Sequence, residues 1–271
     1  MKSENKILTA FILNALFSVF EFLGGIYTGS ISIISDAMHD FGDAISIGIS
    51  YILEKISKRK PDNTYTFGYA RYSVVGAIFT SITLISGSVA IIYNAIDRII
   101  NPKEIHTKYM LIFASFGVFI NSLAVFFTHN GHSHNEKAIN LHMLEDVFGW
   151  IIVFIGSVII SITNITVIDP ILSVFVSIFI SINAIKIFKD SFDIILEKSP
   201  KNIDVNFIEN EINQIDGVKS IYNIKIWSLN EETHYAIAHI KSDETKNRNY
   251  KKEIKQKFLQ YGIQNVTIEE E

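Results

Sequence analysis

Residues 72–96 read YSVVGAIFTSITLISGSVAIIYNAI, which is 25 residues without an Asp, Glu, Lys or Arg. Two more charge-free runs follow, 20 residues long at 109–128 and 22 residues long at 147–168. A helix of about 20 apolar residues crosses the hydrocarbon core of a bilayer. Each run is therefore long enough to span a membrane, and the chain is predicted to be an α-helical membrane protein.

Three further segments are apolar but carry ionisable side chains. Residues 7–27 contain Glu21, residues 31–53 contain a histidine and three aspartates, and residues 170–188 are charge-free until Lys186. Together with the charge-free runs they predict six transmembrane helices, at about 7–27, 30–53, 72–98, 108–128, 138–163 and 168–190.

Lys and Arg predict the orientation of these helices, because short basic loops stay on the cytoplasmic side. With the N-terminus inside, the inner segments carry 12 Lys or Arg residues, and the outer segments carry Arg98, Lys103 and Lys108. The sequence therefore predicts a multi-pass protein of the cell membrane with both termini in the cytoplasm.

The composition changes near residue 200. Residues 1–199 hold 14 Lys or Arg and 16 Asp or Glu, whereas the much shorter stretch 200–271 holds 10 and 12. We therefore expect a transport domain at 1–199 and a small cytoplasmic α/β domain at 200–271. Its periodicity predicts the order αββαβ, with a helix, two strands, a helix and a strand at 204–215, 219–229, 234–240, 246–261 and 265–270.

Several function classes are excluded by composition. The net charge of −4 argues against a nucleic-acid binder. The chain has no Cys, so thiolate metal sites and Cys nucleophiles are excluded. It also has no G-x-x-x-x-G-K-[ST] phosphate loop, and we expect no nucleotide partner.

Two histidine–aspartate pairs stand inside the predicted spans. His39 and Asp43 are four residues apart, and His142 and Asp146 repeat this spacing on another span. Residues i and i+4 share one helix face, so each pair can act together. Two imidazoles and two carboxylates suit tetrahedral Zn²⁺, although Co²⁺, Fe²⁺ and Mn²⁺ stay open.

A single pair of this kind could equally be a hydrogen-bonded structural pair. Each buried Asp costs roughly 2.5–3.5 kcal/mol on insertion scales, so something must compensate for the aspartates of the second span. The repetition of the same pair on two spans favours a metal site.

Six short stretches carry a resemblance to a known family. Residues 20–30 read FEFLGGIYTGS, residues 35–39 read SDAMH and residues 67–71 read FGYAR. Further along, the chain reads HMLED at 142–146, DP at 169–170 and IKIWSL at 224–229. In this order the stretches resemble the cation diffusion facilitator family, and its zinc-transporting branch in particular.

The resemblance implies a homodimeric metal/proton antiporter rather than an enzyme. It implies six spans in the lipid bilayer and a metallochaperone-like cytoplasmic domain. The family's transport-site ligands fall on His39, Asp43, His142 and Asp146. A histidine at the first of these positions implies zinc as the transported ion, with cobalt as a second possibility.

Other histidines are candidates for secondary metal binding. His132 and His134 lie in the loop before the fifth span, where they could capture zinc or belong to a polar linker. The resemblance places possible cytoplasmic ligands at His239 and at Glu269 or Glu271. Tyr222 departs from the family pattern, since relatives often carry a histidine there.

The chemistry follows from competition for the same ligands. Zinc needs neutral imidazoles and ionised carboxylates, so zinc binding releases protons, and inward proton flow could drive zinc out. The same ligands could serve a manganese, iron or cobalt exporter, or a proton-uncoupled channel or sensor. A membrane metal hydrolase is disfavoured, because four ligands leave no open position for water. The roles of four other carboxylates stay open: Glu21, Asp36, Asp40 and Glu145.

Overall fold

The structure is a computed structural model. It describes residues 3–28, 31–101, 107–129, 134–163, 168–243 and 249–270. The chain forms two compact units, Met1–Ser191 and Phe192–Glu271.

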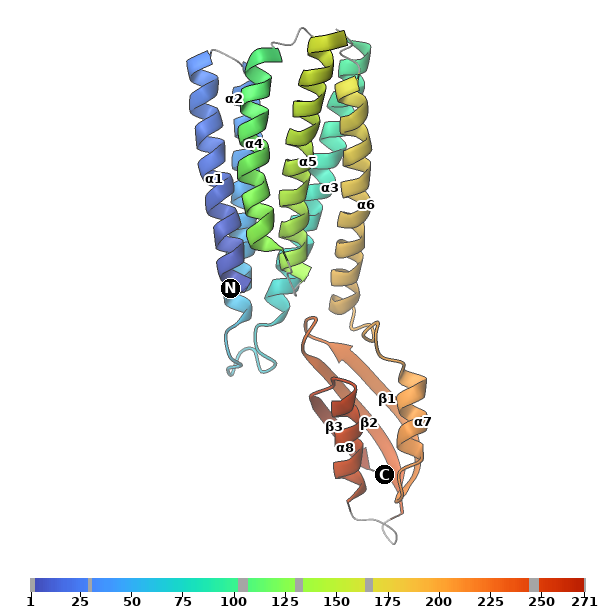
Figure 1. Cartoon of the computed structure of the whole chain (residues 1–271). Coiled ribbons are helices and arrows are strands. Elements are labelled where there is room, and N and C mark those ends of the chain that lie inside the picture. Colours follow the sequence, from blue (N-terminus) through green and yellow to red (C-terminus); the bar gives the residue numbers. More distant parts are fainter. Residues whose placement is uncertain are drawn as a thin grey trace. The chain divides into compact units, whose positions relative to one another are not determined.

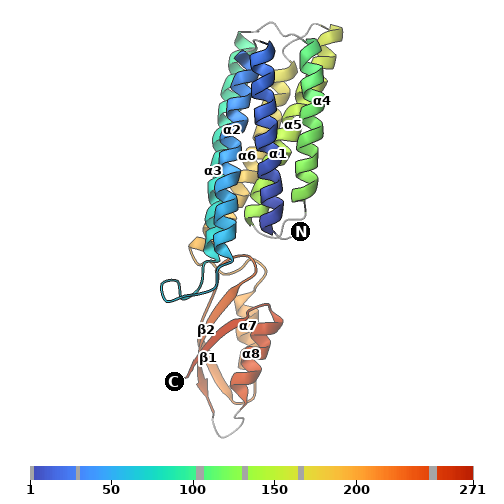
Figure 2. The same ribbon diagram turned by 90° about the vertical axis from the view of Figure 1, so that its left-hand side faces the viewer.

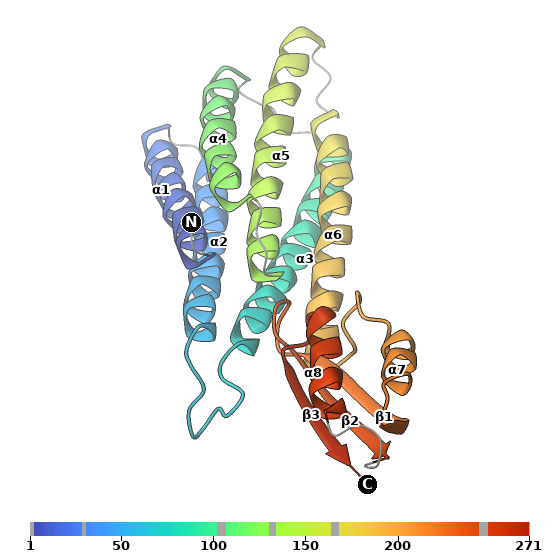
Figure 3. The same ribbon diagram turned by 60° about the horizontal axis from the view of Figure 1, so that its bottom comes forward.

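The first unit is a bundle of long helices (Figure 1). In Figures 1 and 3, α5 lies between α1, α2 and α4 on one side and α3 and α6 on the other. Consecutive helices run in opposite directions, so residues far apart in the sequence meet at one level of the bundle. The bounds are α1 (Ser3–Thr28), α2 (Ile31–Ser57), α3 (Arg71–Ile100), α4 (Thr107–Thr128), α5 (His134–Thr163) and α6 (Ile168–Ile195).

Small side chains let the helices of the bundle approach closely. Many of the fully buried positions are alanines or serines, including Ala10, Ala77 and Ser81. Such residues are typical of helix contacts in membranes, where tight backbone packing replaces the hydrophobic effect. Gly117 of α4 is the tightest case, because a Cβ built there would lie 2.2 Å from the ring of Trp150 in α5.

Within the described residues, three helical stretches are long and apolar enough to cross a membrane. They are Asn5–Leu23, Arg71–Ile100 and His134–Gly156, and a shorter apolar stretch covers Ala114–Thr128. The α2 helix is more polar, because it carries three aspartates together with Glu54 and Lys55.

The second unit is a small α/β domain. Its sheet has the order β1-β2-β3, in which β2 pairs antiparallel with β1 and parallel with β3. Both helices lie on the same side of this sheet (Figure 2). The elements are α7 (Val205–Asn213), β1 (Val218–Ser228), β2 (His234–Ser242), α8 (Tyr250–Gln260) and β3 (Asn265–Glu270).

Local sequence signals explain where these elements begin. Asp204 caps α7, since its carboxylate accepts from the backbone N–H groups of Asn206 and Phe207. Gly217 adopts a φ of 92° in the turn before β1, a conformation that favours glycine. The alternation in β2 turns Ala236, Ala238 and Ile240 toward the helices, where they are buried in the core.

Glu270 ties the last strand to the rest of the second unit. Its carboxylate accepts hydrogen bonds from Lys251, Ser242 and Tyr250, with a distance of 2.5 Å to the Lys251 Nζ. These contacts, that of Lys251 first, lower the pKa of Glu270 to about 2. One carboxylate thus connects β3 with β2 and α8.

We expect the second unit to lose stability in acid through this group. A carboxyl whose pKa is lowered by folding stabilises the fold above its unfolded pKa of 4.5, and that contribution is lost as pH falls toward about 2. The protection factors of the β3 amides, which correct exchange rates for their intrinsic dependence on pH, should therefore fall over this range. In Glu270→Gln the same amides should exchange faster already at neutral pH, and equal protection in both proteins would contradict the role of Glu270.

The Gly117–Trp150 contact predicts a strict size limit in the bundle. Gly117→Ala should lower the free energy of unfolding by roughly 1–3 kcal/mol, because the methyl group overpacks the contact. Thermal unfolding of the purified protein in detergent measures this. Gly149→Ala is the matched control, since nothing lies within 4 Å of a Cβ at that position. Equal melting temperatures for the two variants would contradict the prediction.

Candidate metal centre

Three ionisable side chains converge between α2 and α5. Asp43 lies on α2, and His142 and Asp146 lie one turn apart on α5. One ligand atom from each, an imidazole nitrogen or a carboxylate oxygen, lies within 4.8 Å of the others. The Nε2 of His142 is 3.8 Å from the Oδ2 of Asp43. A cation placed among these atoms would touch all three side chains after small movements.

The group is deeply buried. His142 is 4% exposed and Asp43 is 7% exposed, while Asp146 is partly buried. Neither ring nitrogen of His142 has a hydrogen-bond partner among the described residues. A buried imidazole without hydrogen bonds costs free energy, which a coordinated cation or a proton shared with the carboxylates would recover. The donor set is one nitrogen and two carboxylates, which suits Zn²⁺ and similar divalent ions.

The fourth predicted ligand is described only by its backbone. His39 belongs to the continuous helix α2, one turn before Asp43, but its side chain lies outside the described residues. The structure therefore brings together Asp43, His142 and Asp146. Helical spacing alone puts His39 on the same face of α2 as Asp43.

The neighbouring carboxylates take other positions. Glu145 accepts a hydrogen bond from the Ser88 hydroxyl of α3 at 3.3 Å, so its carboxylate is directed toward α3. Glu21 is buried in α1 at 1% exposure, and Asp40 is half-buried on α2. The side chain of Asp36 lies outside the described residues.

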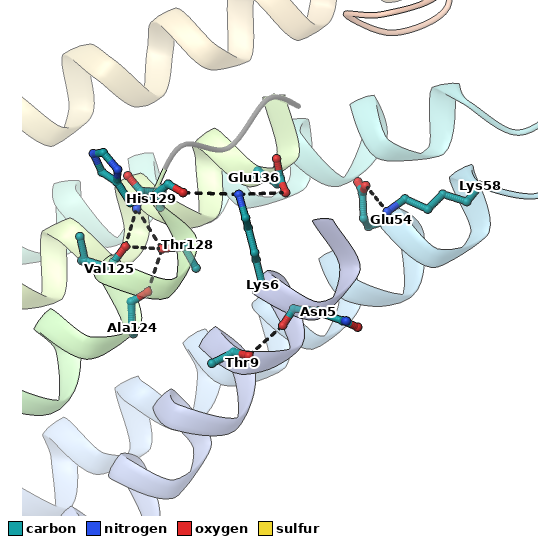
Figure 4. A network of polar contacts seen from close by, with 11 residues as sticks. Asn5, Lys6, Thr9, Glu54, Lys58, Ala124, Val125, Thr128, His129 and Glu136 are labelled. Atoms are coloured by element: carbon teal, nitrogen blue, oxygen red, sulfur yellow. Dashed lines mark hydrogen bonds and ion pairs between the residues drawn. The ribbon is translucent and has the colours of Figure 1, made fainter. Parts of the chain in front are cut away.

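One end of the bundle carries a set of polar contacts that no sequence pattern indicated. We call this the proximal end, where α1, α3 and α5 begin and α2 and α4 end. There Lys6 of α1 lies between Glu136 of α5, at 4.0 Å, and the backbone carbonyl of His129, at 3.4 Å (Figure 4). On α2, Glu54 is buried and pairs with Lys58 at 3.5 Å.

A further buried amide joins the same end. Asn135 of α5 donates from its Nδ2 to the backbone carbonyl of Ser50 at 3.2 Å and to the Glu54 carboxylate at 3.3 Å, both in α2. The signal that could have indicated it is its place seven residues before His142, on the same helix face.

The secondary candidates are less complete. In the second unit the Nδ1 of His239 lies 3.2 Å from the Glu269 carboxylate, and Tyr222 packs beside it with ring centroids 5.9 Å apart. His134 begins α5, and His132 and Glu271 lie outside the described residues. Among the described residues, the Asp43–His142–Asp146 group is the one set of three such ligands within reach of a single ion.

Comparison with known proteins places the chain in a family. A family model described as the cation efflux transmembrane domain matches residues 7–196. The chain belongs to the cation efflux family. This is the cation diffusion facilitator family, and the resemblance to its zinc-transporting branch is confirmed. The match reaches into every helix of the bundle and includes all four predicted transport-site ligands.

Relatives of this cation efflux protein are named for metal transport. It is 33% identical to the zinc transporter ZitB of Yersinia pseudotuberculosis over 234 residues, which are 85% of this chain and 75% of the relative. It is 30% identical to a cadmium, cobalt and zinc/H(+)-K(+) antiporter of Bacillus velezensis over 277 residues, or 99% of this chain and 88% of the relative. It is 29% identical to the metal cation efflux system protein CzcD of Cupriavidus metallidurans, over 98% of this chain and 86% of the relative.

Family membership settles the broad class. The protein is a multi-pass membrane transporter embedded in the lipid bilayer, and it is not an enzyme. The buried Asp–His–Asp group lies inside the matched transmembrane domain.

Proposed function

We propose that this protein is a zinc/proton antiporter that exports Zn²⁺ from the cytoplasm. The observation that carries the proposal is the buried group of Asp43, His142 and Asp146, with His39 as the fourth ligand. The relatives named as a zinc transporter and as a zinc/H(+)-K(+) antiporter support the choice of ion and of counter-ion.

The proposed architecture extends the described fold. The helices α1 to α6 are the six spans, within a transport domain at 1–199. The protein lies in the cell membrane, with both termini in the cytoplasm. Residues 200–271 form the cytoplasmic domain, through which two copies form a homodimer. A unit of about 70 residues has a small core, so association would add buried surface.

The proposed mechanism uses the chain's own ligands to exchange metal for protons. With the site open to the cytoplasm, Zn²⁺ binds the ionised carboxylates and the neutral imidazoles and displaces their protons. When the site opens to the other side, where protons are more abundant, protonation of the same groups lowers their affinity and the ion leaves. No other energy source is required, since one set of groups binds both species alternately.

The placement of the ligands on two helices suits alternating access. Asp43 belongs to α2, whereas His142 and Asp146 belong to α5. A small displacement of α2 against α5 changes the distance between the carboxylates and the imidazole, and therefore the affinity for the ion. Metal binding favours the arrangement in which the ligands are close.

The cytoplasmic candidates are proposed as auxiliary sites only. His132 and His134 would hold zinc weakly just before the fifth span, and His239 with Glu271 would hold it in the second unit. The described pair of His239 and Glu269 shows that a carboxylate can reach this imidazole, at 3.2 Å.

Transport by the purified protein in liposomes tests the proposal. A proton gradient should drive Zn²⁺ accumulation, and Asp146→Ala should reduce the flux to the level of empty liposomes because it removes a ligand and a proton acceptor together. Asp97→Asn, an exposed carboxylate at the end of α3, is the control and should transport normally.

Each of the other outcomes would contradict a different part of the proposed function. Zn²⁺ flux that ignores the proton gradient would indicate a channel and contradict the antiporter. Flux of manganese or iron in place of zinc would keep the exporter and overturn its ion. Normal flux in Asp146→Ala would overturn the site.

Cobalt tests the ligand set without transport. Co²⁺ bound to four N/O ligands should give the intense visible absorption of a tetrahedral site, and His142→Ala should abolish it. His39→Ala should do the same if the fourth ligand is correct. An unchanged spectrum in His39→Ala would limit the protein ligands to the three side chains on the described part of the chain.

A further inference from the structure

The metal centre and a second polar contact both lie in the interface between α2 and α5. Asp43 and Ser50 are seven residues apart on α2, and His142 and Asn135 are seven apart on α5. Seven residues are two helical turns, or about 10 Å along the axis, so both members of each pair share one face. Because the helices are antiparallel, both steps lead from the metal centre toward the proximal end.

The second contact holds the two helices together. The Nδ2 of Asn135 donates to the Ser50 carbonyl at 3.2 Å and to the Glu54 carboxylate at 3.3 Å. Asn135 and Ser50 are completely buried, and Glu54 is 3% exposed. Hydrogen bonds to a charged acceptor in such surroundings are among the stronger ones in proteins.

The α3 helix completes this junction and limits its geometry. The Ser50 hydroxyl lies 2.6 Å from that of Thr80 and 3.4 Å from the Gly76 carbonyl, so α2 is joined to α3 at the same level. A Cβ built at Gly76 would lie 2.9 Å from the Oδ1 of Asn135. A methyl group at position 76 would therefore have to displace the carboxamide.

We propose that Asn135 is a positioning residue for the metal centre. Its carboxamide sets the separation and register of α2 and α5 at a point two turns from the ligands toward the proximal end. It thereby determines how closely Asp43 approaches His142 and Asp146. This inference rests on the proposed function of that group as the transport site. Ligands must be held within about 0.5 Å of their working positions, so a loosened junction should weaken metal binding although Asn135 touches no metal.

The test is the equilibrium affinity of the full-length purified protein for Zn²⁺, measured by competition with a fluorescent chelator. Asn135→Ala removes the donated hydrogen bonds and should raise the Kd about tenfold, as loss of a supporting residue does in other metal sites. Gly76→Ala keeps every hydrogen-bonding group but displaces the carboxamide, and it should raise the Kd similarly.

A matched control lies on the same helix. Asn140 of α5 donates to the Thr128 hydroxyl at 2.9 Å and to the Val125 carbonyl at 3.4 Å, so it joins α5 to α4 instead of α2. Asn140→Ala loses an equivalent set of contacts and should leave the Kd within about twofold. The melting temperatures of Asn135→Ala and Asn140→Ala, measured without zinc, show whether the two substitutions destabilise the protein equally.

The outcomes separate the two proposals. An unchanged Kd in Asn135→Ala, or an equal rise in Asn140→Ala, would overturn the positioning role. If Asn135→Ala does not fold, Gly76→Ala decides, and an unchanged Kd there overturns the role. Asp146→Ala, measured in the same way, tests the site itself, and zinc binding that survives this substitution overturns the proposed function. If Asp146→Ala loses zinc binding but Asn135→Ala has a normal Kd, only the positioning role is overturned.

Discussion

The meeting of Asp43 with His142 and Asp146 is the constraint around which the bundle is arranged. Carboxylates within an apolar helix are costly when they face lipid, at roughly 2.5–3.5 kcal/mol each on insertion scales. Directing them inward, toward an imidazole on the facing helix, offsets part of that cost and brings together groups that could hold a cation. The spacing of 3.8 Å between His142 and Asp43 shows that α2 and α5 satisfy this requirement together.

Close helix packing makes this arrangement stable. Contacts through small residues, such as Gly117 against Trp150, bring the backbones near one another and leave little room for adjustment. Polar side chains then fix the register of neighbouring helices. Ser50 with Thr80 joins α2 to α3, and Asn135 joins α5 to α2. Asp43, His142 and Asp146 are therefore carried on helices whose relative positions are defined at several levels.

The second unit is stabilised in a different way from the bundle. It has an ordinary apolar core between a three-stranded sheet and two helices, supported by ion pairs such as Lys251 with Glu270. His239 and Glu269 stand on neighbouring strands in register. Their position on the sheet face away from the core leaves them accessible, unlike the buried group of Asp43, His142 and Asp146.

Most of the fold was predictable because hydropathy and periodicity are local. Charge-free runs indicated helices at 72–96 and 109–128, which lie within α3 and α4, and the first part of the third run lies within α5. The expected strand at 234–240 lies within β2. The capping of α7 by Asp204 is equally local, because it depends on adjacent residues alone. The spacing of His142 and Asp146 also placed both on one face of a single helix.

Only the tertiary structure decided which helices meet. The repeated His–Asp spacing predicted that the two pairs share a site, but it does not state how the two helices pack, since each pattern describes one helix at a time. The same holds for Asn135 with Ser50 and Glu54, and for the turning of Glu145 toward Ser88. The sequence by itself determined the helices, the strands and the chemistry available on each face. Packing determined which faces combine, because that choice depends on the close fit of side chains from distant parts of the chain.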